Sequence, residues 1–591
     1  MKKGSCAMKL LKELRYIFPR KQRLLFLLLF FLQLIATVFD FLGVSLILPF
    51  INVLLNPAAA HNASWYRWVA SLLGTQTEEA VLLFITAAIM AVYIIKNLYS
   101  LLMINLNARF VSANKIRMGA RMIRCYMNKP YTFHLQRNTA EIVRNINGDV
   151  NGAFSVVSTL LSLISDVLIV AVLVIYLVAV DVWMTLAISA ALLLCSALYF
   201  LFVRRRIRET GKKSRTYTAK MYKAIHQSMG GIKEVKVMGR EAFFADAYEQ
   251  AGARSVELGR RYSIIAAIPN RLIETLCVCS VLGVIAYRIV YGADLAAVVP
   301  SLSAFALAAV RLMPRAAAIN SAINAITFNR PSLDALYDDL RASEREEAER
   351  AAEIARKKRE PRTVQRSTEN DISVNAVTYT YPNRDEPVLK DVTLRIRHGE
   401  SVGIIGVTGA GKTTLIDLML GLLKPDTGSV CYGALDIYED YAEWQRHIGY
   451  IPQNIYLVDD TIRNNVALGV EAERIDDAAV WRALESAQLA AFVCGLKDGL
   501  DTVIGERGVR ISGGQRQRIG IARALYNDPE ILFFDEATSA LDNETEAAVM
   551  DAINTLGSSK TMVIVAHRLT TLRDCDVIFK VKDGGVEVTR L

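Results

Sequence analysis

The chain has 591 residues, 52% of them hydrophobic, and a formal net charge of +10. That hydrophobic content is high for a soluble protein and is expected if about half of the chain lies in a membrane. The Lys and Arg residues flank apolar segments instead of gathering in one region, which indicates membrane topology and argues against nucleic-acid binding.

Six apolar segments in the first 330 residues each reach the length of about 20 residues that crosses a bilayer. They cover residues 24–55, 80–106, 154–180, 182–203, 271–291 and 297–326. The first is far longer than the apolar core of a signal peptide, so we expect it to remain as a membrane span. With a basic N-terminus, six spans predict that both termini lie in the cytoplasm.

The connections on the cytoplasmic side are long and those outside are short, except the first. Residues 107–152 and 204–270 are predicted to continue the membrane helices towards a cytoplasmic motor. In the first outer loop, Trp65, Tyr66 and Trp68 predict an amphipathic turn or two that anchors at the interface; lipid binding is the alternative. The expected domains are a membrane domain (1–330), a charged, helical linker (331–370) and a soluble α/β domain (371–591).

The soluble part contains a phosphate-binding pattern. Residues 406–413 fit GxxxxGK[ST], after the apolar strand 401–405 and before a helix beginning at Thr414. In such a loop the backbone N–H groups surround phosphates, Lys412 reaches the β- and γ-phosphates, and Thr413 binds Mg²⁺. The pattern therefore predicts nucleotide binding by Gly406, Thr408, Gly409, Ala410, Gly411, Lys412, Thr413 and Thr414.

Two adjacent carboxylates end a second apolar strand, residues 531–535. Asp535 is placed to hold Mg²⁺, and Glu536 is placed to orient and deprotonate an attacking water. A lone acidic pair would be weak evidence, but together with the phosphate loop it predicts a hydrolase.

A third motif lies between these two. Ser512, Gly513, Gly514 and Gln515, before a helix at 518–525, resemble the signature motif of ABC ATPases, with Ile511 where that family usually has Leu. The start of this helix offers a second anion site. The resemblance implies that this site completes the ATP pocket of a partner domain.

The resemblance to ABC ATPases also implies roles for single residues. It places Tyr381 against the adenine, Gln453 as a link between Mg²⁺ and the membrane domain, Asp542 in a loop that crosses the dimer interface, and His567 near the γ-phosphate. The implied cofactors are ATP and Mg²⁺.

One chain carries one membrane domain and one ATPase domain, so it is similar to half of an ABC exporter. The expected fold is an α-helical six-span membrane domain of ABC exporter type plus an α/β P-loop nucleotide-binding domain. We expect a homodimer, because Glu536, His567 and Ser512 are all present for each site. A heterodimer with another chain is the alternative.

Basic residues within the spans indicate the substrate. Lys96 and Arg311 lie mid-span, Arg315 follows Arg311 by one turn on the same face, and Arg271 begins the fifth span. Facing a cavity, they would suit an anionic headgroup, above all a phosphate or diphosphate. The alternative, snorkelling to the interface, explains Arg271 comfortably but Lys96 and Arg311 less well.

A closer resemblance covers residues 43–49, 266–271, 308–314 and 448–457, which are similar to the bacterial lipid-linked oligosaccharide flippases of protein N-glycosylation. It implies outward flipping of an undecaprenyl-diphosphate-linked glycan in a bacterial inner membrane. Lys96, where an Arg is expected, and the spacing of Arg315 depart from that family. A multidrug or lipid exporter is the main alternative; a non-transporting ABC channel or regulator fits less well with the intact Glu536.

Overall fold

The computed structural model describes residues 3–45, 64–74, 78–180, 182–290, 295–357, 370–536, 547, 560–566, 572–573 and 575–589. The chain divides into two compact units. The first comprises Met1–Lys129 and Gln136–Ala348, and the second comprises Pro130–Leu135 and Glu349–Leu591.

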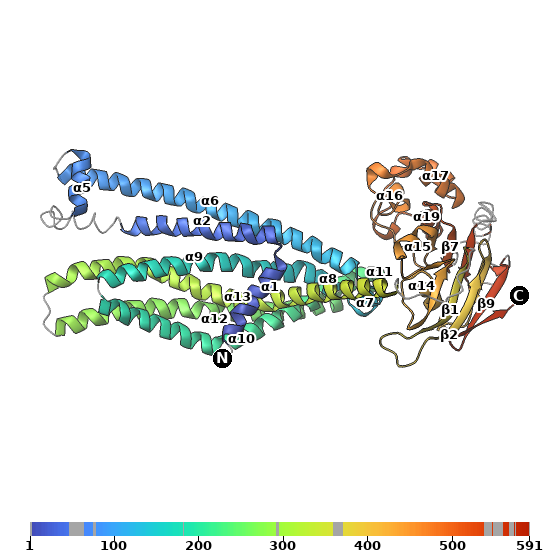
Figure 1. Ribbon diagram of the computed structural model, residues 1–591, viewed down its shortest axis with the longest axis horizontal. Coiled ribbons are helices and arrows are strands. Elements are labelled where there is room, and N and C mark those ends of the chain that lie inside the picture. The colour runs from blue at the N-terminus through green and yellow to red at the C-terminus, as the bar shows by residue number, and fades with distance from the viewer. Residues whose placement is uncertain are drawn as a thin grey trace. The chain divides into compact units, whose positions relative to one another are not determined.

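The first unit is built from long helices that lie side by side (Figure 1). Each predicted span falls on one of them, although the end of the first span, after Ser45, lies outside the described residues. Three described stretches, Arg20–Phe39, Glu79–Met127 and Thr139–Ile175, are long and apolar enough to cross a membrane. The long helices are α2 (Arg20–Ser45), α6 (Glu78–Met127), α9 (Val150–Val180), α10 (Val182–Gly230), α12 (Glu241–Val290) and α13 (Leu295–Lys357).

The predicted cytoplasmic connections continue these helices, as expected. Shorter helices lie between them: α7 (Tyr131–Gln136), α8 (Thr139–Arg144) and α11 (Ile232–Met238). Helix α13 also runs through the first part of the predicted linker, where Glu344 and Glu346 pair with Arg121 and Lys129. These ion pairs link α13 to α6 and to Lys129 just beyond its end, and the first unit extends to Ala348.

Two helices outside the main bundle have buried anchors. Helix α5 (Ser64–Leu73) packs Tyr66 and Val69 against α6 and leaves Trp68 and Leu72 exposed, as an interfacial amphipathic helix requires. Helix α1 (Lys3–Ile17) buries Glu13, whose carboxylate accepts a hydrogen bond from Arg330 of α13.

Two glycines let α9 and α10 approach α13 closely. We call these contacts, of Gly211 with Phe328 and of Gly152 with Ser332, the α13 clamp. A Cβ atom on Gly211 of α10 would lie 2.1 Å from the carbonyl oxygen of Phe328, so no side chain fits there. A Cβ atom on Gly152 of α9 would lie 2.8 Å from the side chain of Ser332, one turn further along α13. Small residues at such contacts allow the backbones to pack directly against each other.

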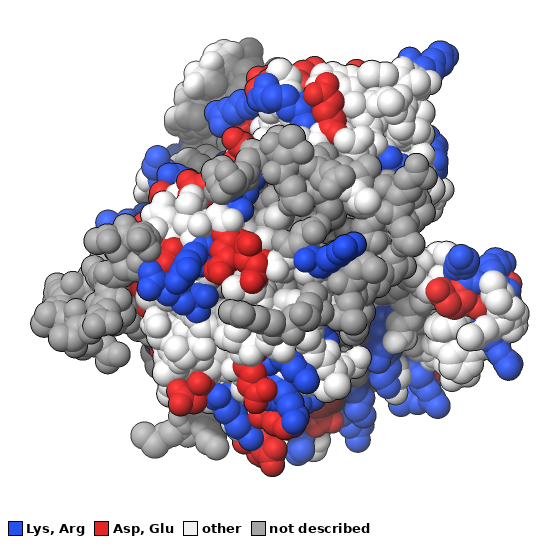
Figure 2. Space-filling view, turned by 90° about the vertical axis from the view of Figure 1, so that its right-hand side faces the viewer, with Lys and Arg blue, Asp and Glu red and all other residues white. Residues whose placement is uncertain are grey.

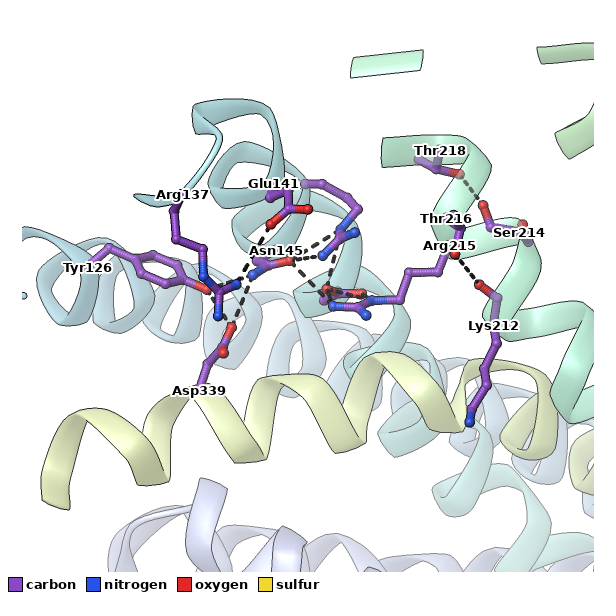
Figure 3. Close-up of polar contacts among 12 residues, drawn as sticks. Tyr126, Arg137, Glu141, Asn145, Lys212, Ser214, Arg215, Thr216, Thr218 and Asp339 are labelled. Carbon is purple, nitrogen blue, oxygen red and sulfur yellow. Dashed lines mark hydrogen bonds and ion pairs between the residues drawn. The ribbon is translucent and has the colours of Figure 1, made fainter. Parts of the chain in front are cut away.

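One turn of π-helix, η1 (Asn145–Asp149), separates α8 from α9 and carries a buried polar network (Figure 3). Asp149 accepts three hydrogen bonds of 2.8–3.0 Å from the Arg215 guanidinium of α10. Asn145 donates to Tyr126 of α6 at 2.9 Å and to Asp339 of α13 at 3.0 Å, and Tyr126 donates to Asp339 at 2.6 Å. The network therefore ties three long helices to the π-helix.

The second unit contains two sheets. The first is antiparallel, in the order β2 (Leu389–Ile396), β1 (Ile372–Tyr379), β4 (Thr427–Tyr432) and β5 (Leu435–Asp436). The second is parallel except at its β10 edge, with the order β10 (Gly585–Thr589), β9 (Val577–Lys582), β3 (Ser401–Ile405), β8 (Thr561–Val565), β7 (Ile531–Asp535) and β6 (Ile448–Ile451). The predicted strands 401–405 and 531–535 are thus both confirmed.

Helices complete this α/β unit around two apolar cores. One core lies between the sheets and includes Leu415, Trp444 and Phe533; the other includes Leu484 and Ile519 from the helical side. Basic and acidic side chains are interspersed on the face shown in Figure 2. The helices are α14 (Lys412–Met419), α15 (Tyr441–His447), α16 (Ile462–Val466), α17 (Asp477–Ser486), α18 (Ala490–Cys494) and α19 (Gly513–Leu525), with 3₁₀ turns η2 (Ala472–Arg474), η3 (Gly499–Asp501) and η4 (Glu506–Gly508).

Candidate functional site

The predicted phosphate loop connects the buried strand β3 to the start of α14. Gly406, Gly409 and Gly411 have φ angles of 156°, 85° and 107°, which favour glycine, and a Cβ atom on Gly406 would lie 2.5 Å from the carbonyl oxygen of Val581. Gly411 caps α14 without a side-chain hydrogen bond. The first N–H groups of the helix are therefore available to an anion.

Lys412 is almost completely buried beside this loop. Its ammonium group donates to the carbonyl oxygens of Gly406 at 2.9 Å and Val407 at 3.3 Å. These bonds hold the charge over the loop, while the neighbouring Thr408, Gly409 and Thr413 are exposed. The loop thus brings together the Lys412 ammonium, backbone N–H groups and the Thr413 hydroxyl.

The carboxylates of Asp535 and Glu536 follow β7 at the same edge of the parallel sheet. Asp535 is buried; burial and the neighbouring Glu536 raise its pKa, and Lys412 opposes this shift. The Glu536 carboxylate accepts a hydrogen bond of 2.7 Å from the Gln453 amide, in the loop after β6. Because β6 and β7 are paired strands, the sheet brings Gln453 and Glu536 together.

The oxygen atoms present at this site suit Mg²⁺. No group of three or more His, Cys, Asp or Glu side chains gathers as a metal site within the described parts of the chain. Asp535 and the exposed Thr413 hydroxyl offer the few hard ligands with which Mg²⁺ binds beside nucleotide phosphates. The residues therefore fit a nucleotide-bound Mg²⁺, with Gln453 held nearby by Glu536.

Tyr381 lies at the first sheet and reaches the phosphate-loop helix. Its hydroxyl is 3.1 Å from the Thr414 hydroxyl, and its ring packs edge-on against Tyr379 with centroids 5.1 Å apart. This places an aromatic ring beside the loop that is predicted to bind phosphates, so stacking on the adenine stays a prediction.

The signature motif forms the N-terminus of α19. The Ser512 hydroxyl accepts a hydrogen bond from the Gln515 N–H, and the Gln515 side chain accepts one from the Ser512 N–H, which is a complete capping box. Ser512 and Gly513 are exposed. Completion of a partner's ATP pocket stays a prediction. Asp542 and His567 lie outside the described residues; in the sequence His567 is two residues after the end of β8 (Thr561–Val565).

A buried carboxyl that the motifs did not single out lies on α14. Burial, and then the nearby Asp535, raise the pKa of Asp417 to about 7. The pKa of an unfolded Asp is about 3.9, so the folded state binds the proton more tightly. The stability that this proton contributes is complete below about pH 4 and is lost as the pH rises towards 7.

We expect Asp417→Asn to stabilise the protein at alkaline pH, because the amide stays neutral where the carboxyl ionises. The measurement is the melting temperature of the detergent-purified full chain from pH 5 to pH 8, without nucleotide or Mg²⁺. The advantage of the variant over wild type should grow with pH. Glu587→Gln, on the exposed part of β10, is the control and should show no such trend. A pH-independent difference for Asp417→Asn would contradict the role of its charge.

The four predicted membrane cations are placed differently from one another. Lys96 lies over the Tyr93 ring, with its ammonium 5.3 Å from the centroid. Arg271 is exposed and pairs with Glu274 at 3.1 Å. Arg311 lies on α13, but its side chain is outside the described part of the structure.

Arg315 has a partner that sequence reasoning missed. Its guanidinium donates to Asp166 of α9 at 2.9 Å. The two residues are far apart along the chain, and Asp166 stands alone in an apolar run, which is the only signal in the sequence. Which of the four cations face one cavity stays a prediction.

Comparisons with known proteins agree with this geometry. The family model described as ABC transporter matches residues 389–539, and the model of the ABC transporter transmembrane region matches residues 26–297. The ATP-dependent lipid A-core flippase of Cupriavidus metallidurans is 30% identical over 477 residues, which cover 80% of this chain and 78% of the relative. The flippase of the same name from Escherichia coli K12 is 31% identical over 390 residues, covering 65% and 64%.

A solved structure shares the fold. It is described as a bacterial Atm1-family ABC exporter with ATP bound, and it matches with a TM-score of 0.72 over 96% of this chain and 94% of that chain. Its sequence identity is 22%, so the likeness concerns the fold alone. A helical transmembrane domain followed by an α/β nucleotide-binding domain is the architecture predicted from the sequence.

Proposed function

Because this chain belongs to the ABC transporter family, we propose that it is an ATP-driven flippase for a polyprenyl-diphosphate-linked oligosaccharide. It would move this lipid from the cytoplasmic leaflet to the outer leaflet. The observation that supports an anionic lipid is the presence of basic side chains, Lys96 on α6 and Arg315 on α13, among mostly apolar neighbours along these helices.

ATP hydrolysis powers the transport, and this proposal assigns the following roles to single residues. The N–H groups of residues 406–411 and the Lys412 ammonium bind the phosphates. Thr413 and Asp535 would hold Mg²⁺, which would supply positive charge to offset the charge that develops on the phosphates. Glu536, oriented by the Gln453 amide, positions the attacking water and accepts its proton.

The charged headgroup and the apolar tail of this substrate have different requirements, and a membrane domain with basic side chains can meet both. A diphosphate-sugar headgroup cannot cross hydrocarbon unaided, since its charges lose their hydration there. The polyprenyl tail need never leave the lipid. Cations along the membrane helices give the headgroup partners during passage, and Arg in particular forms paired hydrogen bonds with phosphate oxygens.

The working unit in this proposal is a homodimer in a bacterial inner membrane, with both termini in the cytoplasm. The exposed N-terminus of α19, with Ser512 and Gly513, would face the phosphates bound by the second copy. Asp542 and His567 would act at the same interface. The exposed Trp68 and Leu72 of α5 would rest at the outer surface of the membrane.

Export of another lipid is the second candidate, because the relatives named above are lipid A-core flippases. Both candidates share the motor and the membrane domain. They differ in the lipid that must enter the membrane domain, so only a transport measurement separates them.

The test is flipping of fluorescent lipids by the purified chain in proteoliposomes. We expect ATP-dependent flipping of polyprenyl-diphosphate oligosaccharide by wild type and none by Glu536→Gln. A labelled lipid A-core glycolipid is the parallel substrate. Flipping of that lipid alone would move the assignment to the second candidate. Flipping of neither lipid, with ATPase activity stimulated by apolar drugs, would contradict both.

A further inference from the structure

Helices α9 and α13 are joined within the apolar region by one ion pair of opposite charges. Arg315 Nη1 donates to Asp166 Oδ1 at 2.9 Å, and Asp166 lies in the stretch Thr139–Ile175 that is apolar enough to span a membrane. A charge at this depth is costly unless it is paired. The pair therefore gives each of the two charges a partner in an apolar setting.

The carboxylate of Asp166 lies in a more buried setting than the guanidinium of Arg315. One turn along α9, Ile169 and Leu173 pack against Leu312 of α13, and on the other side Ser165 accepts a hydrogen bond of 2.8 Å from Gln33 of α2. The Asp166 side chain is 9% exposed, whereas that of Arg315 is 39% exposed. The carboxylate is thus buried on α9, close to where this helix packs on α13 and bonds to α2, and the arginine that reaches it is more exposed.

The turn of α13 that carries Arg315 is weakened. Pro314 directly precedes Arg315, has no N–H group and so removes one hydrogen bond of the helix, that to the carbonyl of Val310. Arg315 also has a long side chain with several rotatable bonds. Of the two partners, Arg315 is thus the one that can move to a ligand while Asp166 stays in place.

We infer that Asp166 is a positioning and specificity-determining residue, an internal counter-ion that holds Arg315 until an anionic headgroup displaces it. This inference rests on the proposed function. A diphosphate carries more charge than a carboxylate and offers the guanidinium two parallel hydrogen bonds. It can therefore replace Asp166. A neutral or zwitterionic lipid interacts too weakly with the guanidinium to compensate for breaking the ion pair. Asp166 would exclude uncharged lipids from this part of the path.

The test is lipid-stimulated ATPase activity of the full chain in nanodiscs, with polyprenyl diphosphate as the probe. Asp166→Asn keeps the size and an acceptor atom but removes the competing charge, so we expect its KM for the probe to fall about tenfold with kcat within about twofold. Arg315→Gln should raise KM about tenfold. Stimulation by a neutral polyprenol should appear only in Asp166→Asn.

The double variant tests whether Asp166 acts by competition. If it does, Asp166→Asn added to Arg315→Gln leaves KM unchanged, because no guanidinium is left for the carboxylate and the probe to compete for. The double variant buries no unpaired charge, so this comparison still applies if Asp166→Asn alone fails to fold. Ser162→Ala, at an exposed position one turn away on α9, is the control and should leave KM unchanged.

The outcomes separate the inference from the proposed function. An unchanged or raised KM in Asp166→Asn would make the pair a structural tie, and a double variant with a lower KM than Arg315→Gln would mean that the carboxylate acts without Arg315. Either result overturns the inference alone. A wild type that polyprenyl diphosphate does not stimulate would overturn the proposed substrate and this inference together.

Discussion

Replacing Glu536 by Gln is expected to lower ATP hydrolysis by roughly 10²–10⁴-fold, the usual contribution of a general base. The amide can still contact Gln453, which holds the wild-type carboxylate at 2.7 Å, but it cannot accept a proton from water. ATP affinity should stay within a few fold, because Lys412 and the phosphate-loop N–H groups are untouched. The measurement is phosphate release by the full chain, with ATP binding followed separately.

The control for this change is Glu587→Gln, the same substitution on an exposed part of β10. It should hydrolyse ATP like wild type. If Glu536→Gln kept a tenth or more of the wild-type rate, another group would have to be the base. If it lost ATP binding instead, Glu536 would have a structural role in the loop, where its φ angle of 51° is already unusual.

Removing the guanidinium of Arg215 is expected to destabilise the first unit by about 3 kcal/mol, the lower end of the range for breaking a buried ion pair. Asp149 would lose three hydrogen bonds while staying buried in the π-helix. The more distant Arg144, at 3.8 Å, would offset part of the loss. A lower melting temperature of Arg215→Ala in detergent is the direct measurement.

A matched variant lies on the same helix. Arg205 is 91% exposed and pairs with Glu209, so Arg205→Ala removes a surface ion pair worth about 0.5 kcal/mol or less. Arg215→Lys should fall between the two, since it keeps the charge but loses the paired geometry. Equal melting temperatures for Arg215→Ala and Arg205→Ala would show that the network in Figure 3 contributes no stability.

The elements of the motor domain could be predicted because their signals are local. An apolar run predicts the strand before Gly406, and the glycine pattern predicts the loop and the helix after it. The long membrane helices follow equally from apolar length. The charged residues after Arg330 could be predicted as helical, but their packing on α6 depends on Arg121 and Lys129, far away in sequence.

The contacts on which the chemistry depends were harder to predict from the sequence. The bond between Gln453 and Glu536 requires the pairing of β6 with β7, which no local pattern specifies. The π-helix at Asn145 differs from an α-helix by a shift in hydrogen bonding, and side chains from three other helices stabilise it. Arg315 could be recognised as a cation in a span, but its partner Asp166 could be found only from the packing of α9 on α13.

The α13 clamp has a mechanical consequence. Gly152 and Gly211 meet α13 at Phe328 and Ser332, and Pro331 lies between these contacts, where it removes a backbone hydrogen bond of the helix. The backbone contact of Gly211 with Phe328 and the close approach of Gly152 to the Ser332 side chain oppose sliding of α13, while the missing bond makes bending easier. The helix is thus jointed at this level, with arms of about 50 Å towards Leu295 and about 44 Å towards Lys357. The two arms can change the angle between them at the clamp. Bending of one arm then need not shift the other arm along the helix axis.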